Sequence, residues 1–281
     1  MSLHDSSAEE TQLNDEMIEA NRALWNEWTR VHETSEFYDV AAFKAGRETL
    51  RPLEIEELGD VAGKSLLHLQ CHFGLDTMSW ARLGAKATGV DFSEEAISTA
   101  QSLSNELGID ARFICSNIYD LPNILDEQFD IVFTSYGVLA WLPDLDKWAQ
   151  TVAHFVKPGG VFHIAEIHPI ESMMEYDAET GELKWEYPYF FQSQPIKSEC
   201  VHTYAAEDAA SGSPVTYEWC HSLGEIVTSL INAGLTIEYL HEFPFCCYQP
   251  FPCMTQDENG WWRLPEKYRD LPLLFSIKAR K

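Results

Sequence analysis

Two short stretches of the chain place polar side chains where a strand pattern gives way to a helix pattern. Gln70-Cys-His-Phe-Gly74 follows the apolar segment 65–69 and precedes a helical pattern. Backbone amides at a helix start can approach a polar ligand closely, and Gly74 leaves room for that approach. Asp91 follows the apolar segment 85–90, and a carboxylate there can accept hydrogen bonds from both hydroxyls of a ribose. The two stretches together predict a site for a ribose-bearing ligand.

The segments that must position these residues alternate between strand and helix patterns. Strands are expected at 65–69, 85–90, 111–116, 129–135, 161–167, 235–243 and 273–281. Helices are expected at 75–83, 94–107 and 145–156, and after the capping box Ser222-Leu-Gly-Glu225. Such alternation favours right-handed βαβ units and a parallel sheet, which binds ligands at the carboxyl ends of its strands.

Three segments lie outside this alternation. Residues 1–13 are polar and acidic, so we expect a disordered tail, followed by one domain over residues 14–281. Residues 14–58 are expected to form an N-terminal helical cap. Residues 168–221 hold glycines, prolines and an aromatic run at 185–191, which favours an insertion with its own short strands. This insertion either forms a lid over the active site or simply packs on the sheet.

Taken in order, the motifs resemble those of the class I S-adenosylmethionine-dependent methyltransferases. Gly89-Val-Asp91-Phe-Ser93 is similar to the ribose-binding strand end of that family, and residues 116–122 (SNIYDLP) to its adenine-contacting stretch. Residues 129–136, Leu142-Pro-Asp144 and the turn Lys157-Pro-Gly-Gly160 resemble its fourth strand and the elements beyond. The resemblance implies an α/β, Rossmann-like, doubly wound seven-stranded sheet that is mostly parallel, with an antiparallel last strand.

The first turn departs from the pattern of that family. The family reads hydrophobic-Asp-hydrophobic-Gly-x-Gly-x-Gly, whereas this chain reads His68-Leu-Gln70-Cys-His72-Phe-Gly74, so that only Gly74 matches. The family uses this turn to hold the amino-acid end of the cofactor. The departure therefore changes the residues that would contact that end. The chain also resembles a bacterial methyltransferase-like subgroup of unassigned substrate that carries the same turn.

The resemblance implies S-adenosyl-L-methionine as the cofactor and assigns its contacts. The cofactor-binding residues expected from it are Gln70, Cys71, His72, Gly74, Asp91, Phe92, Ser93, Asn117, Ile118, Ser135 and Tyr136, with Trp25 and Tyr38 as capping residues. Asn117 stands where the family usually has Asp, and its amide can bond the adenine amino group. Structural alternatives are a loop position on a solvated face for His72, a helix cap for Asp91, and ordinary packing for Trp25 and Tyr38.

Methyl transfer is an in-line displacement for which an enzyme mainly supplies proximity and orientation. A base is needed only where the acceptor has a proton to lose. The candidate catalytic residues at strand ends are His168 and Tyr136, with Glu166 beside them. His168 has the most suitable ordinary pKa, but it precedes Pro169, so a purely structural turn is the alternative. His68 lies inside a strand and is expected to be a core histidine with its hydrogen bonds satisfied.

Composition excludes several function classes. The net charge of −26, from 19 basic and 45 acidic residues, repels phosphate backbones and anionic membranes, so neither is an expected partner. No apolar run is long enough for a membrane-spanning helix, and the N-terminus lacks the features of a signal peptide, which favours a cytoplasmic location. Cys246, Cys247 and Cys253 are close in sequence, but no CxxC pair occurs, so we expect buried thiols and no metal site.

The expected function is therefore an S-adenosylmethionine-dependent methyltransferase that acts on an unidentified small-molecule acceptor, as a monomer or homodimer. One alternative is a non-catalytic protein that binds S-adenosylmethionine or a nucleotide on the same fold. A weaker alternative is an NAD(P)-dependent oxidoreductase, which requires Gly-x-Gly-x-x-Gly at the first turn. Residues 70–74 do not supply that sequence.

Overall fold

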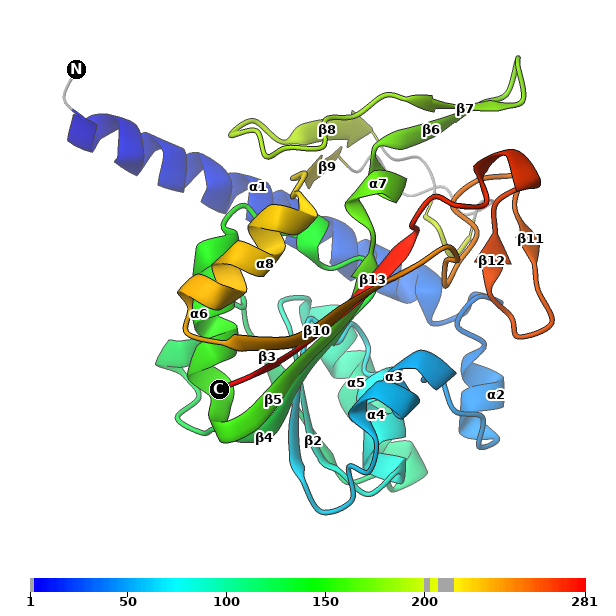
Figure 1. Ribbon diagram of the computed structural model, residues 1–281. Coiled ribbons are helices and arrows are strands. Elements are labelled where there is room, and N and C mark those ends of the chain that lie inside the picture. The colour runs from blue at the N-terminus through cyan, green and yellow to red at the C-terminus, as the bar shows by residue number, and fades with distance from the viewer. Residues whose placement is uncertain (1–2, 200–202, 207–214) are drawn as a thin grey trace. The chain divides into compact units, whose positions relative to one another are not determined.

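The computed structural model describes residues 3–199, 203–206 and 215–281. The strands of the main sheet are β1 (Ser65–Leu69), β2 (Lys86–Asp91), β3 (Ala111–Cys115), β4 (Phe129–Ser135), β5 (Val156–Ile167), β10 (Thr236–Phe243) and β13 (Leu274–Arg280). They form one seven-stranded sheet in the order β10-β13-β5-β4-β1-β2-β3 (Figure 1). β2 pairs in parallel with β1 and β3, whereas β13 runs antiparallel to both β5 and β10. The predicted Rossmann-like sheet with an antiparallel last strand is thus confirmed.

The chain divides into two compact units, and the first comprises Met1–Phe129 and Gln194–Glu218. Besides β1, β2 and β3, this unit carries α1 (Leu3–His32), α2 (Val40–Lys44), α3 (Pro52–Leu58), α4 (Leu75–Arg82), α5 (Glu94–Leu107), the 3₁₀ helix η1 (Leu121–Asn123), β8 (Ile196–Glu199) and β9 (Val215–Glu218). β8 and β9 form a two-stranded hairpin, so this part of the predicted insertion belongs to the first unit.

The second unit comprises Asp130–Ser193 and Trp219–Lys281. Besides the remaining strands of the sheet, it carries η2 (Leu139–Trp141), α6 (Leu145–Phe155), α7 (Pro169–Ser172), β6 (Met174–Asp177), β7 (Glu182–Trp185), α8 (Leu223–Asn232), β11 (Thr255–Gln256), β12 (Trp262–Arg263) and η3 (Glu266–Tyr268). β6 and β7 form a second hairpin from the predicted insertion. The insertion over 168–221 is therefore divided between the two units.

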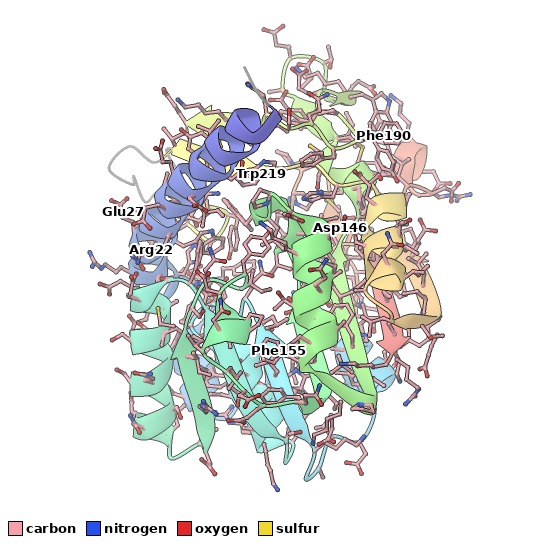
Figure 2. All side chains as sticks on the ribbon, turned by 90° about the vertical axis from the view of Figure 1, so that its left-hand side faces the viewer. Arg22, Glu27, Asp146, Phe155, Phe190 and Trp219 are labelled. Carbon is pink, nitrogen blue, oxygen red and sulfur yellow. The ribbon has the colours of Figure 1, made fainter. Side chains whose placement is uncertain are left out.

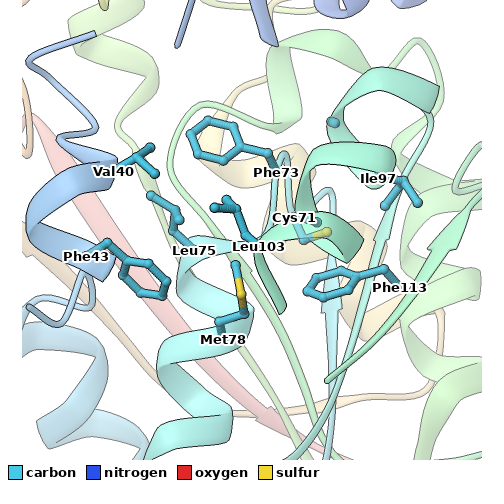
Figure 3. Close-up of a cluster of buried hydrophobic side chains, with 11 residues drawn as sticks. Val40, Phe43, Cys71, Phe73, Leu75, Met78, Ile97, Leu103 and Phe113 are labelled. Atoms are coloured by element: carbon cyan, nitrogen blue, oxygen red, sulfur yellow. The ribbon is translucent and has the colours of Figure 1, made fainter. Parts of the chain in front are cut away.

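A hydrophobic cluster fills the first unit around the turn that follows β1 (Figure 3). Its buried members are Val40, Phe43, Cys71, Phe73, Leu75, Met78, Ala96, Ile97, Ala100, Leu103 and Phe113. Gly89 on β2 faces this cluster, and a Cβ added there would lie 2.8 Å from Cys71 Sγ and 2.9 Å from Phe113 Cδ1. A side chain at Gly89 would thus force the turn away from β2, because packed interiors have little free volume.

The helix after β2 begins and ends where its sequence predicts. The Ser93 hydroxyl accepts a hydrogen bond from the Ala96 amide at 3.1 Å, which caps α5. Gly108 ends the helix in the left-handed conformation with φ of 63°. Ala96, Ala100 and Leu103 are buried along one face, as the apolar stripe predicts.

In the second unit, α6 presents an apolar face whose last residue, Phe155, is fully buried (Figure 2). Asp146 in its first turn accepts a hydrogen bond of 2.7 Å from the Ser229 hydroxyl of α8. β5 begins at Val156, five residues before the expected start, so Lys157–Gly160 is not a free turn. The Gly159 amide donates to Lys281 O at 2.9 Å, which shows that the end of the chain extends the pairing.

The N-terminal segment also differs from expectation. α1 begins at Leu3, whereas the sequence predicted disorder through residue 13. Among the described residues, no helix has the length and apolar character needed to cross a membrane.

Candidate functional site

The turn after β1 has a backbone conformation that glycine ordinarily supplies. Gln70 has φ of 55° and His72 has φ of 50°, while Gly74 has φ of 78°. Residues other than glycine pay about 1 kcal/mol or more for this left-handed conformation. Gln70 and His72 occupy the two positions where the methyltransferase pattern has glycine, and both adopt a conformation that glycine adopts without strain.

Asp91 holds this turn against the end of β2. Its Oδ2 accepts a hydrogen bond from the His72 amide at 2.8 Å, and its Oδ1 accepts one from the Ser93 amide at 3.0 Å. The side chain is 8% exposed, and burial raises the pKa of its carboxyl to about 6 although the amide hydrogen bonds lower it. Asp91 therefore joins the two stretches that the sequence predicted as one ligand site.

The side chain of His72 lies against a second histidine from α1. His72 Nε2 is 2.9 Å from His32 Nδ1, and His32 Nε2 is 2.6 Å from Thr203 Oγ1. Burial lowers the pKa of His32 to about 3, and burial together with His32 lowers the pKa of His72 well below its usual value. Both imidazoles are therefore neutral near pH 7.

The predicted capping residues lie beside this histidine pair. The ring of Trp25 is 5.2 Å from that of His72, and the ring of Tyr38 is 5.5 Å from it. The hydroxyl of Tyr38 is also within 2.5 Å of the Tyr204 hydroxyl. Trp25 and Tyr38 thus lie beside the turn, and their capping of the cofactor stays a prediction.

His32, Thr203 and Tyr204 were not predicted as site residues. His32 carried a weak signal in the sequence, because it lies four residues after Trp28 on the same face of a helix. Thr203 and Tyr204 carried none, since they reach the histidine pair only through the tertiary fold.

Several predicted cofactor contacts have side chains with other partners. Cys71 is part of the buried hydrophobic cluster, and the Ser93 hydroxyl donates to Asn26 Oδ1 at 2.7 Å while it caps α5. The side chains of Cys71 and Ser93 are thus engaged within the protein. Phe92, between Asp91 and Ser93, uses its carbonyl oxygen to accept a weak hydrogen bond of 3.6 Å from Cys115 Sγ.

The stretch predicted to contact adenine begins beside Asp91. The Ser116 amide donates to Asp91 O at 2.9 Å, and Ile118 is buried. The amide oxygen of Asn117 accepts a hydrogen bond from the Tyr119 amide at 3.0 Å. One of the two lone pairs of that oxygen is therefore used within the protein.

In the second unit, Glu166 at the end of β5 orders the loop that follows β4. Its buried carboxylate accepts hydrogen bonds from the amides of Val138 at 2.8 Å and Leu139 at 3.2 Å, and also from those of Gly137 and Ile167. Burial raises the pKa of this carboxyl, and the amide donors oppose that rise. Its geometry is that of a backbone anchor and not of a general base.

The loop that Glu166 orders begins with two predicted site residues, Ser135 and Tyr136. Ser135 is the last residue of β4 and is buried. Tyr136 has φ of 32°, and its amide donates to Ala165 O at 2.8 Å. A positive φ at a residue other than glycine is a strained conformation that often marks a functional position.

Both ring nitrogens of His168 have partners. Nδ1 accepts a hydrogen bond from the Ile170 amide at 3.0 Å and so caps α7, and Nε2 lies 3.0 Å from Glu242 Oε1. Because Nδ1 accepts, Nε2 carries the proton and donates to Glu242. The geometry therefore fits the structural alternative for His168 and not the role of a base.

His68 and the clustered cysteines have surroundings that are typical of residues with a structural role. His68 Nδ1 is 2.9 Å from Thr77 Oγ1, and burial lowers the pKa of His68 to about 3. Cys246 and Cys247 are buried, and Cys253 is partly buried. In the part of the chain that the structure describes, no three His, Cys, Asp or Glu side chains are grouped as metal ligands would be.

Comparisons with known sequences relate the chain to methyltransferases. Residues 67–164 match the family model described as a methyltransferase domain. The chain is 30% identical over 141 residues to the ubiquinone biosynthesis O-methyltransferase of Pseudomonas syringae pv. tomato. This match covers 50% of this chain and 57% of that protein. It is 32% identical over 106 residues to the enzyme of the same name from Chromobacterium violaceum, covering 38% and 45%. The matched segment thus spans about half the length of these curated relatives.

Comparisons with solved structures agree on the fold. An S-adenosylmethionine-dependent methyltransferase from Mesorhizobium loti superposes with a TM-score of 0.58 at 22% identity, covering 82% of this chain and 96% of that one. The complex of DhpI with SAH superposes with a TM-score of 0.54 at 18% identity, covering 94% and 96%. At these identities the likeness establishes the fold.

Proposed function

We propose that this chain, whose residues 67–164 form a methyltransferase domain of the class I fold, transfers a methyl group from S-adenosylmethionine to a small-molecule acceptor. The observation that carries the proposal is the pairing of the turn after β1 with Asp91. Gln70, His72 and Gly74 of the turn hold left-handed backbone conformations, and Asp91 accepts a hydrogen bond from the His72 amide at 2.8 Å. This backbone shape is one that glycine adopts readily, which supports the alignment of the turn with the glycine-rich pattern.

The residues of the first unit fit the three parts of the methyl donor. Asp91 is a buried acceptor at the end of β2, suited to the ribose hydroxyls. Asn117 and Ile118 offer a polar and an apolar group for the adenine. The imidazole of His72 is assigned to the amino-acid end.

When bound, S-adenosylmethionine supplies an electrophilic methyl group, and the protein's task is to orient it toward the acceptor. In the second unit, Tyr136 holds a strained φ of 32° at the exit of β4, which makes it a residue to test by substitution. Glu166 holds the loop after Tyr136, and His168 holds the start of α7.

The proposed acceptor is a small molecule and not a nucleic acid. A net charge of −26 disfavours approach of any polyanion. The curated relatives are named as O-methyltransferases, which makes a hydroxyl the first acceptor group to test. Since the match covers about half of each chain, the identity of the acceptor is left to experiment.

Isothermal titration calorimetry with S-adenosylhomocysteine at pH 7 tests the donor site. Asp91→Ala should weaken binding at least tenfold, about 1.4 kcal/mol. Asp110→Ala, which changes an exposed aspartate outside the site, is the matched control and should leave the affinity unchanged. NAD should not bind. Absence of any binding of S-adenosylhomocysteine at about millimolar concentration would refute the proposal.

Methyl transfer itself is tested by following labelled methyl groups from S-adenosylmethionine into a panel of hydroxylated, amine and thiol compounds. Uptake by one of these compounds, with no uptake by DNA or RNA, is the expected result. Tight binding of the donor without uptake by any compound would favour the non-catalytic alternative.

A further inference from the structure

Three side chains from distant parts of the sequence form one hydrogen-bonded chain in the first unit. Thr203 lies between β8 and β9, His32 ends α1, and His72 lies in the turn after β1. The links are 2.6 Å between Thr203 Oγ1 and His32 Nε2 and 2.9 Å between His32 Nδ1 and His72 Nε2. Thr203 and His32 are buried, at 3% and 0% exposure.

The surroundings of Thr203 fix the direction of this chain. The Ala205 amide donates to Thr203 Oγ1 at 3.0 Å, so the hydroxyl oxygen already accepts one hydrogen bond. The hydroxyl group of Thr203 then donates its proton in a hydrogen bond to His32 Nε2. The opposite direction would leave that proton without an acceptor among the described residues.

The direction at Thr203 determines the tautomers of both histidines. A neutral imidazole has one donor and one acceptor nitrogen. Because His32 Nε2 accepts from Thr203, His32 Nδ1 carries a proton and donates to His72 Nε2. The proton of His72 is therefore on Nδ1.

His72 Nδ1 is buried and has no hydrogen-bond partner among the described residues. A buried donor that lacks an acceptor is destabilising, and native proteins rarely leave one without a partner. The missing acceptor is thus expected from a ligand. A carboxylate is the acceptor that gains most, because a hydrogen bond to a charged group is roughly twice as strong as a neutral one.

We propose that Thr203 and His32 are positioning residues that set the tautomer of His72, so that His72 Nδ1–H donates to the carboxylate of the methyl donor. The inference rests on the proposed function, which places the amino-acid end of the donor at this turn. It adds two residues of the first unit, one of them in the inserted segment, to the recognition of that end.

Two ligands separate the carboxylate contact from the rest of the site. S-adenosylhomocysteine carries the amino-acid end, whereas 5′-methylthioadenosine has the same adenine, ribose and thioether without it. Calorimetry at pH 7 with the full chain should show that Thr203→Val weakens S-adenosylhomocysteine about tenfold. The same variant should bind 5′-methylthioadenosine as wild type does. Thr203→Ser keeps the hydroxyl and should retain wild-type affinity for both ligands.

A double-mutant cycle tests whether Thr203 acts through His72. His72→Gly removes the imidazole and tolerates the φ of 50° at this position. It should weaken S-adenosylhomocysteine about tenfold, and Thr203→Val should then have no further effect. Additive losses in the double variant would overturn the proposal.

Nitrogen-15 NMR of labelled histidines reports the tautomer of His72 directly, without any measurement of binding. His72 should show the pattern of an imidazole protonated on Nδ1, and that pattern should change in Thr203→Val. Protonation of His72 on Nε2 in the wild-type protein overturns the inference, as does an equal loss of both ligands in Thr203→Val. Failure of both ligands to bind wild-type protein would instead refute the proposed function.

Discussion

At the scale of single residues, Gln70 and His72 hold positive φ angles without being glycine. Neighbouring groups keep them there, because the Cys71 amide donates to Val90 O at 2.9 Å and the His72 amide donates to Asp91 at 2.8 Å. Strain of this kind persists only where the surroundings over-determine the backbone. The sites are therefore places where glycine should improve stability.

Gln70→Gly should raise the free energy of unfolding by about 1 kcal/mol, because glycine adopts a φ of 55° without steric strain. Chemical denaturation followed by circular dichroism measures the change. Gln101→Gly is the matched control, since Gln101 lies in the interior of α5. It should lower the free energy of unfolding by about 1 kcal/mol. The prediction fails if both variants change stability in the same direction.

Asp91 gives the site a pH dependence. Burial raises the pKa of Asp91 from 3.8 to about 6, so the carboxyl is partly protonated in the free protein near pH 6 and below. Ribose hydroxyls that donate to the carboxylate favour its charged form. The affinity for S-adenosylhomocysteine should therefore rise as the pH rises through about 6, and level off above it.

Calorimetry between pH 5 and pH 8 measures this profile. Asp91→Asn has no titrating group at this position and should show a weaker affinity that does not change across the same range. We expect no contribution from His32, whose pKa burial lowers to about 3, or from His72, whose pKa is lowered well below its usual value by burial and by His32. A wild-type affinity that is constant or falls with rising pH would contradict the assignment of Asp91.

At the scale of elements, α1 is fastened to the first unit by asparagine side chains. Asn21 donates to Tyr217 O at 2.7 Å and accepts from the Tyr217 amide at 2.9 Å, which ties α1 to β9. Asn26 accepts from the Ser93 hydroxyl at 2.7 Å at the start of α5. These bonds place Trp25 and His32, which lie on α1, against the turn after β1.

Asn21→Ala should destabilise the protein by about 2 kcal/mol, because it leaves two partly buried backbone groups of β9 without these partners. Hydrogen exchange should also become faster at Tyr217. Glu27→Ala is the matched control on the same helix, since Glu27 is exposed and should change stability by less than about 0.5 kcal/mol (Figure 2). Equal effects of the two substitutions would show that Asn21 does not fasten the helix.

The sequence predicted those elements that local patterns determine. β1 and β4 have the bounds expected from their apolar runs, and α5 begins and ends at its predicted caps. The early start of β5 was missed because it depends on pairing with Lys281. In the site, Asp91 and its turn were predicted from spacing. The partners of His168 and the link from Thr203 to His32 were not, because they join residues that only the tertiary fold brings together.

At the scale of the whole molecule, the chain carries a net charge of −26. Like charges on a folded chain repel one another and lower its stability, and salt screens that repulsion. The midpoint of thermal unfolding at pH 7 should therefore rise by a few degrees between about 10 mM and 300 mM NaCl. The rise should be smaller at pH 5, where carboxylates begin to take up protons. A midpoint that falls with added salt would show that attractive ion pairs outweigh the repulsion.

The packing of Cys71 beneath the turn makes the labelling rate of its thiol a measure of how often the turn opens. Cys71 is 5% exposed, Gly89 leaves no gap behind it, and burial raises the pKa of its thiol well above the usual value. Alkylating reagents attack thiolates, so the Cys71 thiol should react only when the turn opens. Cys115 is exposed and should react without any such opening. The rate of Cys71 alkylation thus reports how often the turn opens. A methyl donor bound at the turn would lower this rate in proportion to its occupancy.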